Sequence, residues 1–214
     1  MELLLIRHAQ PVRIEEGEVD GPADPGLTRR GRREAHRLAA WLAHEEIGHV
    51  LTSPLRRARE TAAPLASALG LEVEVDAGLT EYDAEATSYI PIEELRALKD
   101  ERWLATIEGR WEDVGGEPPH VFQQRVVPAV ERIIERFPGR KVAAVSHGGL
   151  INVYLAHVVG MTHNVLWFHP GYTSVSRVHA ARNGPRSVGS INELAHLVAT
   201  RDPLPEPTRK EAAP

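Results

Sequence analysis

The chain has 214 residues, of which 42% are apolar and 26% are charged, and its formal net charge is −5. These values are typical of one globular domain, and the negative charge argues against an electrostatic surface for nucleic acid or acidic lipid. The sequence contains no cysteine, which excludes disulfides, thiolate metal sites and a cysteine nucleophile.

The N-terminal apolar run is short and ends in charge. Residues 3–6 are continuously hydrophobic and lead directly into Arg7 and His8, a pattern typical of a strand buried on both faces. The run is too short for a signal peptide, and no stretch approaches the roughly 20 apolar residues of a membrane span. We therefore expect a cytoplasmic protein without a membrane segment.

A helix, a strand and a second helix are expected next. Thr28 is a candidate N-cap for a helix whose apolar residues recur with the helical period. Residues 49–52 predict a second strand. Ser53 and Pro54 then fit a helix start, with Ser as the N-cap and Pro at the first position. This second helix is expected to end at Gly70.

The middle of the chain is less regular. Residues 72–79 alternate as a third strand, and residues 92–107 predict a helix. This helix lies within the segment 82–120, which we interpret as an insertion, or lid, covering one end of the sheet. A later helix contains Pro128, which should kink it or mark a restart.

The last third returns to alternating strands and helices. Residues 141–149 predict a buried strand that runs into a turn and then into a helix ending at Gly160. Residues 173–181 and 187–197 alternate as two late strands. Pro, Glu and Arg dominate from residue 201, so we expect 201–214 to be a flexible tail.

The order of these elements predicts the fold class. Strands alternating with helices indicate a three-layer α/β/α sandwich with a mostly parallel central sheet. The sequence shows no internal repeat and no domain boundary, so residues 1–200 are expected to form one domain.

Reactive side chains gather at the predicted ends of the strands, where open α/β sheets bind their ligands. They are Arg7, His8, Glu81 and His147, joined by a group of arginines after residue 53. The sequence has no P-loop, no G-x-G-x-x-G, no G-x-S-x-G and no H-E-x-x-H motif. The set suits phosphoryl transfer, because a neutral imidazole can act as the nucleophile, arginines can hold phosphate oxygens and a carboxylic acid can protonate the leaving group.

Five segments in chain order resemble the signatures of the histidine phosphatase superfamily, branch 1, also called phosphoglycerate-mutase-like. They are LIRHA at 5–9, LTRRG at 27–31, SPLRRARETA at 53–62, LTE at 79–81 and SHGG at 146–149. Each alone is a weak signal, but five in family order are specific. The resemblance implies the phosphoglycerate-mutase-like fold and a metal-independent phosphatase that needs no cofactor.

The resemblance also implies a role for each matching residue. His8 would be the phosphorylated nucleophile and Glu81 the proton donor, although Asp83 and Glu85 stand nearby. Arg7, Arg57 and His147 would bind the phosphoryl group, and Arg57 is preferred to its arginine neighbours because it occupies the family's Arg-Ala position.

Two departures from the family pattern concern the substrate side of the site. Ile14 stands where the family often has an asparagine that touches phosphate, and the neighbouring Arg13 is a hypothetical substitute contact. The residues after Glu81 also differ from the family's usual Gly and Trp-Glu-Gly, so the resemblance does not identify the substrate.

Three functional hypotheses remain open. The first is hydrolysis of a small phosphorylated metabolite through a phosphohistidine on His8. The second is phosphoryl transfer of the cofactor-dependent phosphoglycerate mutase type, and the third is a non-catalytic phospho-ligand binder. We expect no nucleic-acid or membrane partner, and the sequence is compatible with a monomer or a homodimer.

Other conspicuous residues have ordinary interpretations. The spacing of His157, His163 and His169 matches no metal-binding pattern, so no metal site is expected. Trp103 and Trp111 in the insertion can either line a substrate lid or pack the insertion onto the core.

Overall fold

A computed structural model describes residues 1–161, 166–182 and 184–198 of the chain. The predicted tail at 201–214, and His163, therefore lie outside the described residues. None of the described helices is long and apolar enough to cross a membrane.

The described strands form one mixed sheet in the order β3-β2-β4-β1-β5-β6. Their bounds are β1 Glu2–Arg7, β2 Ile47–Thr52, β3 Val73–Val75, β4 Lys141–Ser146, β5 Val175–Ala180 and β6 Arg186–Glu193. Strands β1 to β4 run parallel, whereas β5 is antiparallel to both β1 and β6. The prediction of a mostly parallel sheet is confirmed.

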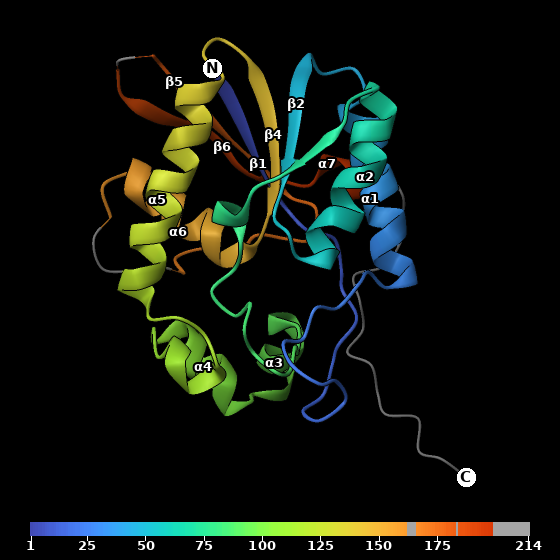
Figure 1. Cartoon of the computed structure of the whole chain (residues 1–214), viewed down its shortest axis with the longest axis vertical. Coiled ribbons are helices and arrows are strands. Elements are labelled where there is room, and N and C mark those ends of the chain that lie inside the picture. Colours follow the sequence, from blue (N-terminus) through green and yellow to red (C-terminus); the bar gives the residue numbers. More distant parts are fainter. Residues whose placement is uncertain (162–165, 183, 199–214) are drawn as a thin grey trace.

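Helices cover both faces of this sheet (Figure 1). They are α1 Arg29–Leu42, α2 Arg56–Leu69, α3 Ile92–Leu98, α4 Glu101–Ile107, α5 Pro119–Arg136, α6 Gly148–Val158 and α7 Ala195–Val198. Alternate residues of β1 serve the two faces: Leu3 and Leu5 pack in the core beneath α5 and α6, and Leu4 and Ile6 in the core beneath α1 and α2. The three-layer sandwich is thereby confirmed.

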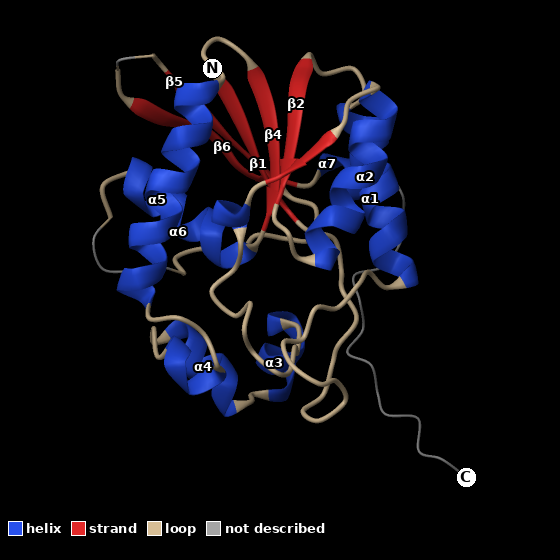
Figure 2. Cartoon of the chain, in the orientation of Figure 1, coloured by secondary structure: helices blue, strands red, loops and turns tan. Residues whose placement is uncertain are grey.

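The segment 82–120, called the lid here, contains two short helices and loops and lies beyond the carboxyl ends of the parallel strands (Figure 2). The predicted helix 92–107 is wrong as a single element, because α3 ends at Lys99, a C-cap residue with a φ of 54°. The side chain of Asp100 then starts α4 by accepting the backbone N–H of Arg102 at 2.9 Å. This turn separates α3 from α4, so residues 92–107 form two short helices instead of one long helix.

The predicted helix boundaries hold at some ends and fail at others. Thr28 caps α1 by accepting the N–H of Gly31 at 2.9 Å, and α2 ends at Gly70, whose φ is 66°. The predicted cap at Ser53 is wrong, since α2 begins two residues after Pro54 with Leu55 as a cap that has no side-chain hydrogen bond. The hydroxyl of Ser53 accepts the backbone N–H of Leu55 itself at 3.3 Å, one residue before the helix begins.

Other elements are shorter or more continuous than the pattern predicted. Only three residues of 72–79 form β3, because the carboxylate of Asp76 accepts the N–H of Gly78 and starts a 3-10 turn over Ala77–Leu79. Helix α5 runs through Pro128 without a restart, and α6 ends at Val158, just short of Gly160. The last predicted strand, 187–197, ends at Glu193 and gives way to the short α7.

Candidate active site

The two histidines are brought together by the pairing of β1 with β4. These strands are parallel with Arg7 opposite Ser146, so the residues that follow them, His8 and His147, are neighbours beyond the same edge. The backbone N–H of His8 donates to the carbonyl of Ser146 at 2.8 Å, and the two imidazole rings lie 5.1 Å apart between centroids. The pairing of the two strands therefore fixes the backbone positions of both histidines.

The ring of His8 is held so that one nitrogen is free to react. Its Nδ1 lies 2.8 Å from the carbonyl oxygen of Ala9, which can only accept a hydrogen bond, so Nδ1 carries the proton and Nε2 keeps its lone pair. Burial lowers the pKa of His8 well below its usual value, and the positive charges of Arg57 and Arg7 lower it further. His8 is therefore neutral at physiological pH, and a neutral imidazole is the form that can act as a nucleophile.

The second histidine is oriented by a serine. His147 Nε2 and Ser53 Oγ are 2.8 Å apart, and the same hydroxyl accepts the backbone N–H of Leu55 at 3.3 Å. Burial, followed by the charge of Arg57, lowers the pKa of His147 well below its usual value. Its Nδ1 is buried and has no hydrogen-bond partner within the described part of the chain.

Two arginines reach the same place from β1 and α2. Arg7 is 4% exposed and Arg57 is 1% exposed, and each guanidinium lies over a tyrosine ring, Arg7 over Tyr172 at 4.3 Å and Arg57 over Tyr89 at 4.4 Å. Each also meets a carboxylate, as described next. The Nε of both arginines is buried without a partner among the described residues.

Two acidic residues on the lid side neutralise these arginines, and the sequence did not indicate either of them as an arginine partner. Glu93 on α3 accepts from Arg7 Nη1 at 2.5 Å and from the Tyr172 hydroxyl at 2.6 Å, and Asp83 accepts from Arg57 Nη2 at 3.3 Å. Burial alone would raise the pKa of Glu93, but the charge of Arg7 and its hydrogen bonds hold it well below the usual range. Glu93 is therefore an anion that belongs to the site, and only the three-dimensional contact identifies it.

Glu81 sits between the end of the 3-10 turn and the start of α6. Its carboxylate accepts the backbone N–H of Gly149 at 2.8 Å and of Leu150 at 3.2 Å. Burial raises the pKa of Glu81 to about 7, and the negative charge of Asp83 contributes to the rise. A Cβ at Gly149 would lie 2.5 Å from Glu81 Oε1, so glycine is needed there for the carboxylate to reach the helix.

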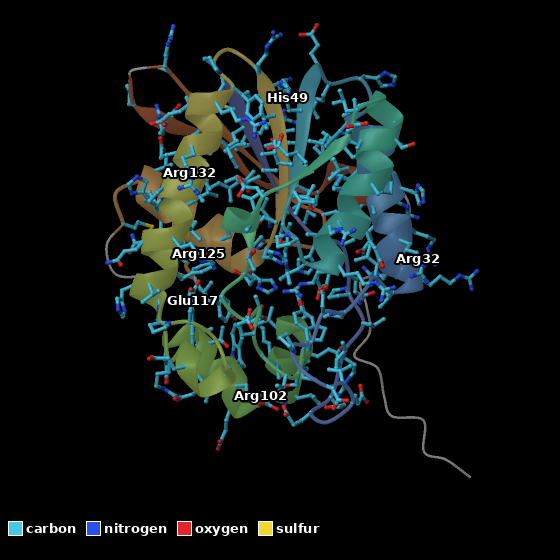
Figure 3. The ribbon with its side chains drawn as sticks, viewed as in Figure 1. Arg32, His49, Arg102, Glu117, Arg125 and Arg132 are labelled. Carbon is cyan, nitrogen blue, oxygen red and sulfur yellow. The ribbon has the colours of Figure 1, made fainter. Side chains whose placement is uncertain are left out.

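Helix α5 supports the backbone beside Glu81. The guanidinium of Arg125 donates to the carbonyl of Thr80 through both Nη atoms at 3.1 Å, and it is also paired with Glu117. Figure 3 shows Arg125 and Glu117 near the lid-facing end of α5. The backbone beside Glu81 is thus held by an arginine that does not line the central cavity.

The fold does not place Arg13 beside the other predicted site residues. Its side chain is paired with Glu15 and with Glu94, 45% of it is exposed, and it does not line the central cavity. Ile14 instead forms a two-way backbone bridge with Tyr89 at 2.8 Å. The position where the family often has asparagine therefore fixes Tyr89, whose ring supports Arg57.

The loop that follows His8 depends on close packing at Gly31. A Cβ at this position would lie 2.1 Å from the carbonyl oxygen of Gln10, which is backbone and cannot move aside alone. We expect Gly31→Ala to lower the free energy of unfolding by about 1–3 kcal/mol and to reduce activity, because the displaced loop carries Ala9 and hence the ring of His8. Thermal unfolding measures the first effect.

The matched control for this prediction is Gly48→Ala on β2. There an added Cβ would meet nothing closer than 3.9 Å, from the carbonyl oxygen of Lys141. If both substitutions change the unfolding temperature equally, the close approach at Gly31 carries no special cost and the explanation is wrong.

A cavity of about 380 Å³ opens from His8, the two arginines and Glu81 toward the lid. Its outer part is lined mainly by apolar and aromatic side chains, among them Ile92, Leu95, Trp103, Ile107, Trp167 and Phe168. Trp103 therefore lines the cavity from the lid, whereas Trp111 is fully buried and stacks on Tyr82 with ring centroids 4.2 Å apart. Of the two roles considered, Trp103 has a lining position and Trp111 packs the insertion onto the core.

No group of three or more His, Cys, Asp or Glu side chains suited to a metal ion occurs within residues 1–161, 166–182 and 184–198. His169 pairs with Glu93 at 3.3 Å at the rim of the cavity, and His157 lies beside the ring of Tyr154 on α6. The conspicuous histidines in the described ranges thus have contacts of other kinds.

Comparison with known proteins identifies the family. The sequence profile of the histidine phosphatase superfamily (branch 1) matches residues 3–193. The bifunctional protein Rv2228c of Mycobacterium tuberculosis is 33% identical over 200 residues, which cover 91% of this chain, and the chain spans only 54% of that protein's length. Phosphoserine phosphatase 1 of Hydrogenobacter thermophilus is 29% identical, with 84% of this chain and 86% of that protein covered.

Solved structures agree on the fold. The YhfR protein of Bacillus stearothermophilus superimposes with a TM-score of 0.71 at 25% identity, and the match covers 92% of this chain and 98% of that one. With the profile match over nearly all of its length, the chain belongs to branch 1 of the histidine phosphatase superfamily.

Proposed function

We propose that this protein is a phosphatase that hydrolyses small phosphorylated metabolites through a phosphohistidine on His8. One observation carries the proposal. The Nε of Arg7, the Nε of Arg57 and the Nδ1 of His147 are all buried around His8 and, within the described ranges, have no partner. A buried donor without an acceptor costs about 1–3 kcal/mol, and an oxyanion with several acceptor oxygens satisfies all three at once.

The first step transfers the phosphoryl group to the enzyme. The lone pair on His8 Nε2 attacks phosphorus, and the P–O bond to the leaving alcohol breaks. Glu81, whose pKa burial raises to about 7, gives its proton to the departing oxygen in its acid form. Arg7 and Arg57 balance the charge on the equatorial oxygens, which is where most of the catalytic effect in phosphoryl transfer arises.

The second step returns the enzyme to its starting state. A water molecule attacks phosphorus, the P–N bond breaks, and the electron pair returns to His8 Nε2. Glu81, now a carboxylate, accepts the proton of the water. The products are inorganic phosphate and the unmodified imidazole, so neither step draws on a redox or metal cofactor.

The relatives support this chemistry at the level of the reaction class. They include a phosphoserine phosphatase and a probable phosphoglycerate mutase of Yersinia enterocolitica, which is 31% identical over 166 residues. Both names describe proteins that act on phosphate esters. Mutase activity is the alternative within the same site, because a phosphohistidine can be returned to a second hydroxyl instead of to water.

The test is phosphate release from a panel of phosphomonoesters in the presence of a metal chelator. We expect release, together with a phosphoenzyme that is labile in acid and stable in alkali, as a phosphohistidine is. Transfer of phosphate between hydroxyl groups without release would support the mutase alternative. Binding of phosphate without turnover of any ester would overturn both enzymatic functions and leave a phospho-ligand binder.

A further inference from the structure

The cavity beside the phosphate-binding residues has two unlike parts. The inner part holds His8, Arg7, Arg57 and Glu81, all nine-tenths buried or more. The outer part must receive whatever is esterified to the phosphate, because it continues from Glu81, the proton donor to the leaving oxygen. The chemistry of this outer part therefore determines which leaving groups the enzyme accepts.

Most side chains that line the outer part are hydrocarbon or aromatic, although Arg96, Arg102 and His169 also line it. Leu95, Trp103 and Ile107 line it from the lid helices α3 and α4, and Trp167 and Phe168 line it from the segment before β5. The rings of Trp167 and Phe168 are 4.8 Å apart between centroids and tilted by 58°. Such surfaces gain free energy from apolar contact and from ring–ring contact with a ligand.

Several polar groups of the outer wall are already committed to the protein. The Asn152 amide donates to the Gly148 carbonyl and its oxygen accepts the N–H of Phe168, while the Trp167 indole donates to the Asn152 carbonyl.

Polar groups on the lid side of the cavity are also bonded to other groups of the protein. The hydroxyl of Thr106 donates to a backbone carbonyl within α4, and Arg102 is paired with Asp100. A hydroxyl-rich leaving group would give up its water here for few replacement hydrogen bonds, which costs binding energy.

We infer that the preferred substrates are phosphomonoesters of apolar alcohols that carry a flat aromatic ring, and that the ring lies against Trp103. The inference rests on the proposed function, since it names the substrate class of the same site. Trp103 is the wall residue to test, because it is only partly buried and its ring lies 5.9 Å from the guanidinium of Arg96, which also lines the cavity.

The experiment compares two esters of equal intrinsic reactivity. 2-Phenylethyl phosphate and glycerol 3-phosphate are both phosphates of primary alcohols, so a difference in kcat/KM reports on the outer cavity and not on the leaving oxygen. We expect the aromatic ester to be preferred at least about tenfold, the discrimination that apolar contacts of this size provide. Trp103→Ala should reduce that preference roughly tenfold.

Leu104→Ala is the matched control, because Leu104 is the next residue of α4, is 46% exposed and does not line the cavity. It should leave the ratio of the two kcat/KM values unchanged. Hydrolysis of both esters without a preference, or an equal change of the ratio in both variants, overturns the substrate class and leaves the phosphatase standing. Hydrolysis of neither ester, or of any other phosphomonoester, overturns the proposed function itself.

Discussion

His8→Ala should abolish phosphate release, with a loss of kcat on the order of 10⁴-fold or more, and should also abolish the acid-labile phosphoenzyme. The reason lies in the geometry of the ring. His8 Nδ1 is committed to the Ala9 carbonyl, so Nε2 is the nitrogen that can attack phosphorus, and burial beside two arginines keeps it unprotonated.

A control is needed because His8 is buried and its removal leaves a hole. His8→Asn fills part of the space without supplying a nucleophile and should be as inactive as His8→Ala. His49→Ala removes a different ring, one that packs on Phe137 at 4.2 Å at the opposite end of the sheet (Figure 3). It should keep full specific activity. Phosphoenzyme formation by His8→Asn would sink the assignment of the nucleophile.

Glu81→Gln should lower kcat/KM for alkyl phosphates by about 10²–10⁴-fold, the range of general acid catalysis. Glutamine retains the size of the side chain but cannot give a proton to the leaving alkoxide. For a reactive aryl ester such as p-nitrophenyl phosphate the loss should be much smaller, because a phenolate leaves without protonation. A loss of equal size for both esters would show that Glu81 supports the fold and not the proton transfer.

The pH dependence provides a second readout of the same residue. Burial raises the pKa of Glu81 to about 7, so the acid form is present below that pH and is lost as the pH rises through it. The kcat/KM for an alkyl ester should therefore fall above about pH 7, and this alkaline limb should be absent in Glu81→Gln. Asp83→Asn removes a negative neighbour, which should shift the limb to lower pH.

The sequence was sufficient for residues whose position follows from the main chain. His8 and His147 follow buried apolar runs, and parallel strands end at one edge of the sheet. The sequence alone therefore predicts that the two histidines lie close together. Thr28 capped its helix as predicted because a cap depends on neighbours only three residues away.

Other features depended on contacts between distant segments. Ser53 was predicted as a helix cap, and nothing in the sequence indicated that its hydroxyl also contacts His147, which is 94 residues away. Glu93 reads as an ordinary solvated helix residue, and its contact with Arg7 depends on how the lid folds over the sheet. The break at Lys99 was also hidden, since the apolar spacing continues across it and only the backbone shows the turn.

The position of β1 in the sheet bears on how the protein is made. Strand β1 is flanked in the finished sheet by β4 and β5, at residues 141–146 and 175–180, and the nitrogen of Met1 donates to the carbonyl of Ala180. A growing chain therefore carries an apolar strand with two open edges until β4 and β5 have been synthesised. Such long-range pairing slows folding, and the pocket around His8 can form only after those two strands have been made.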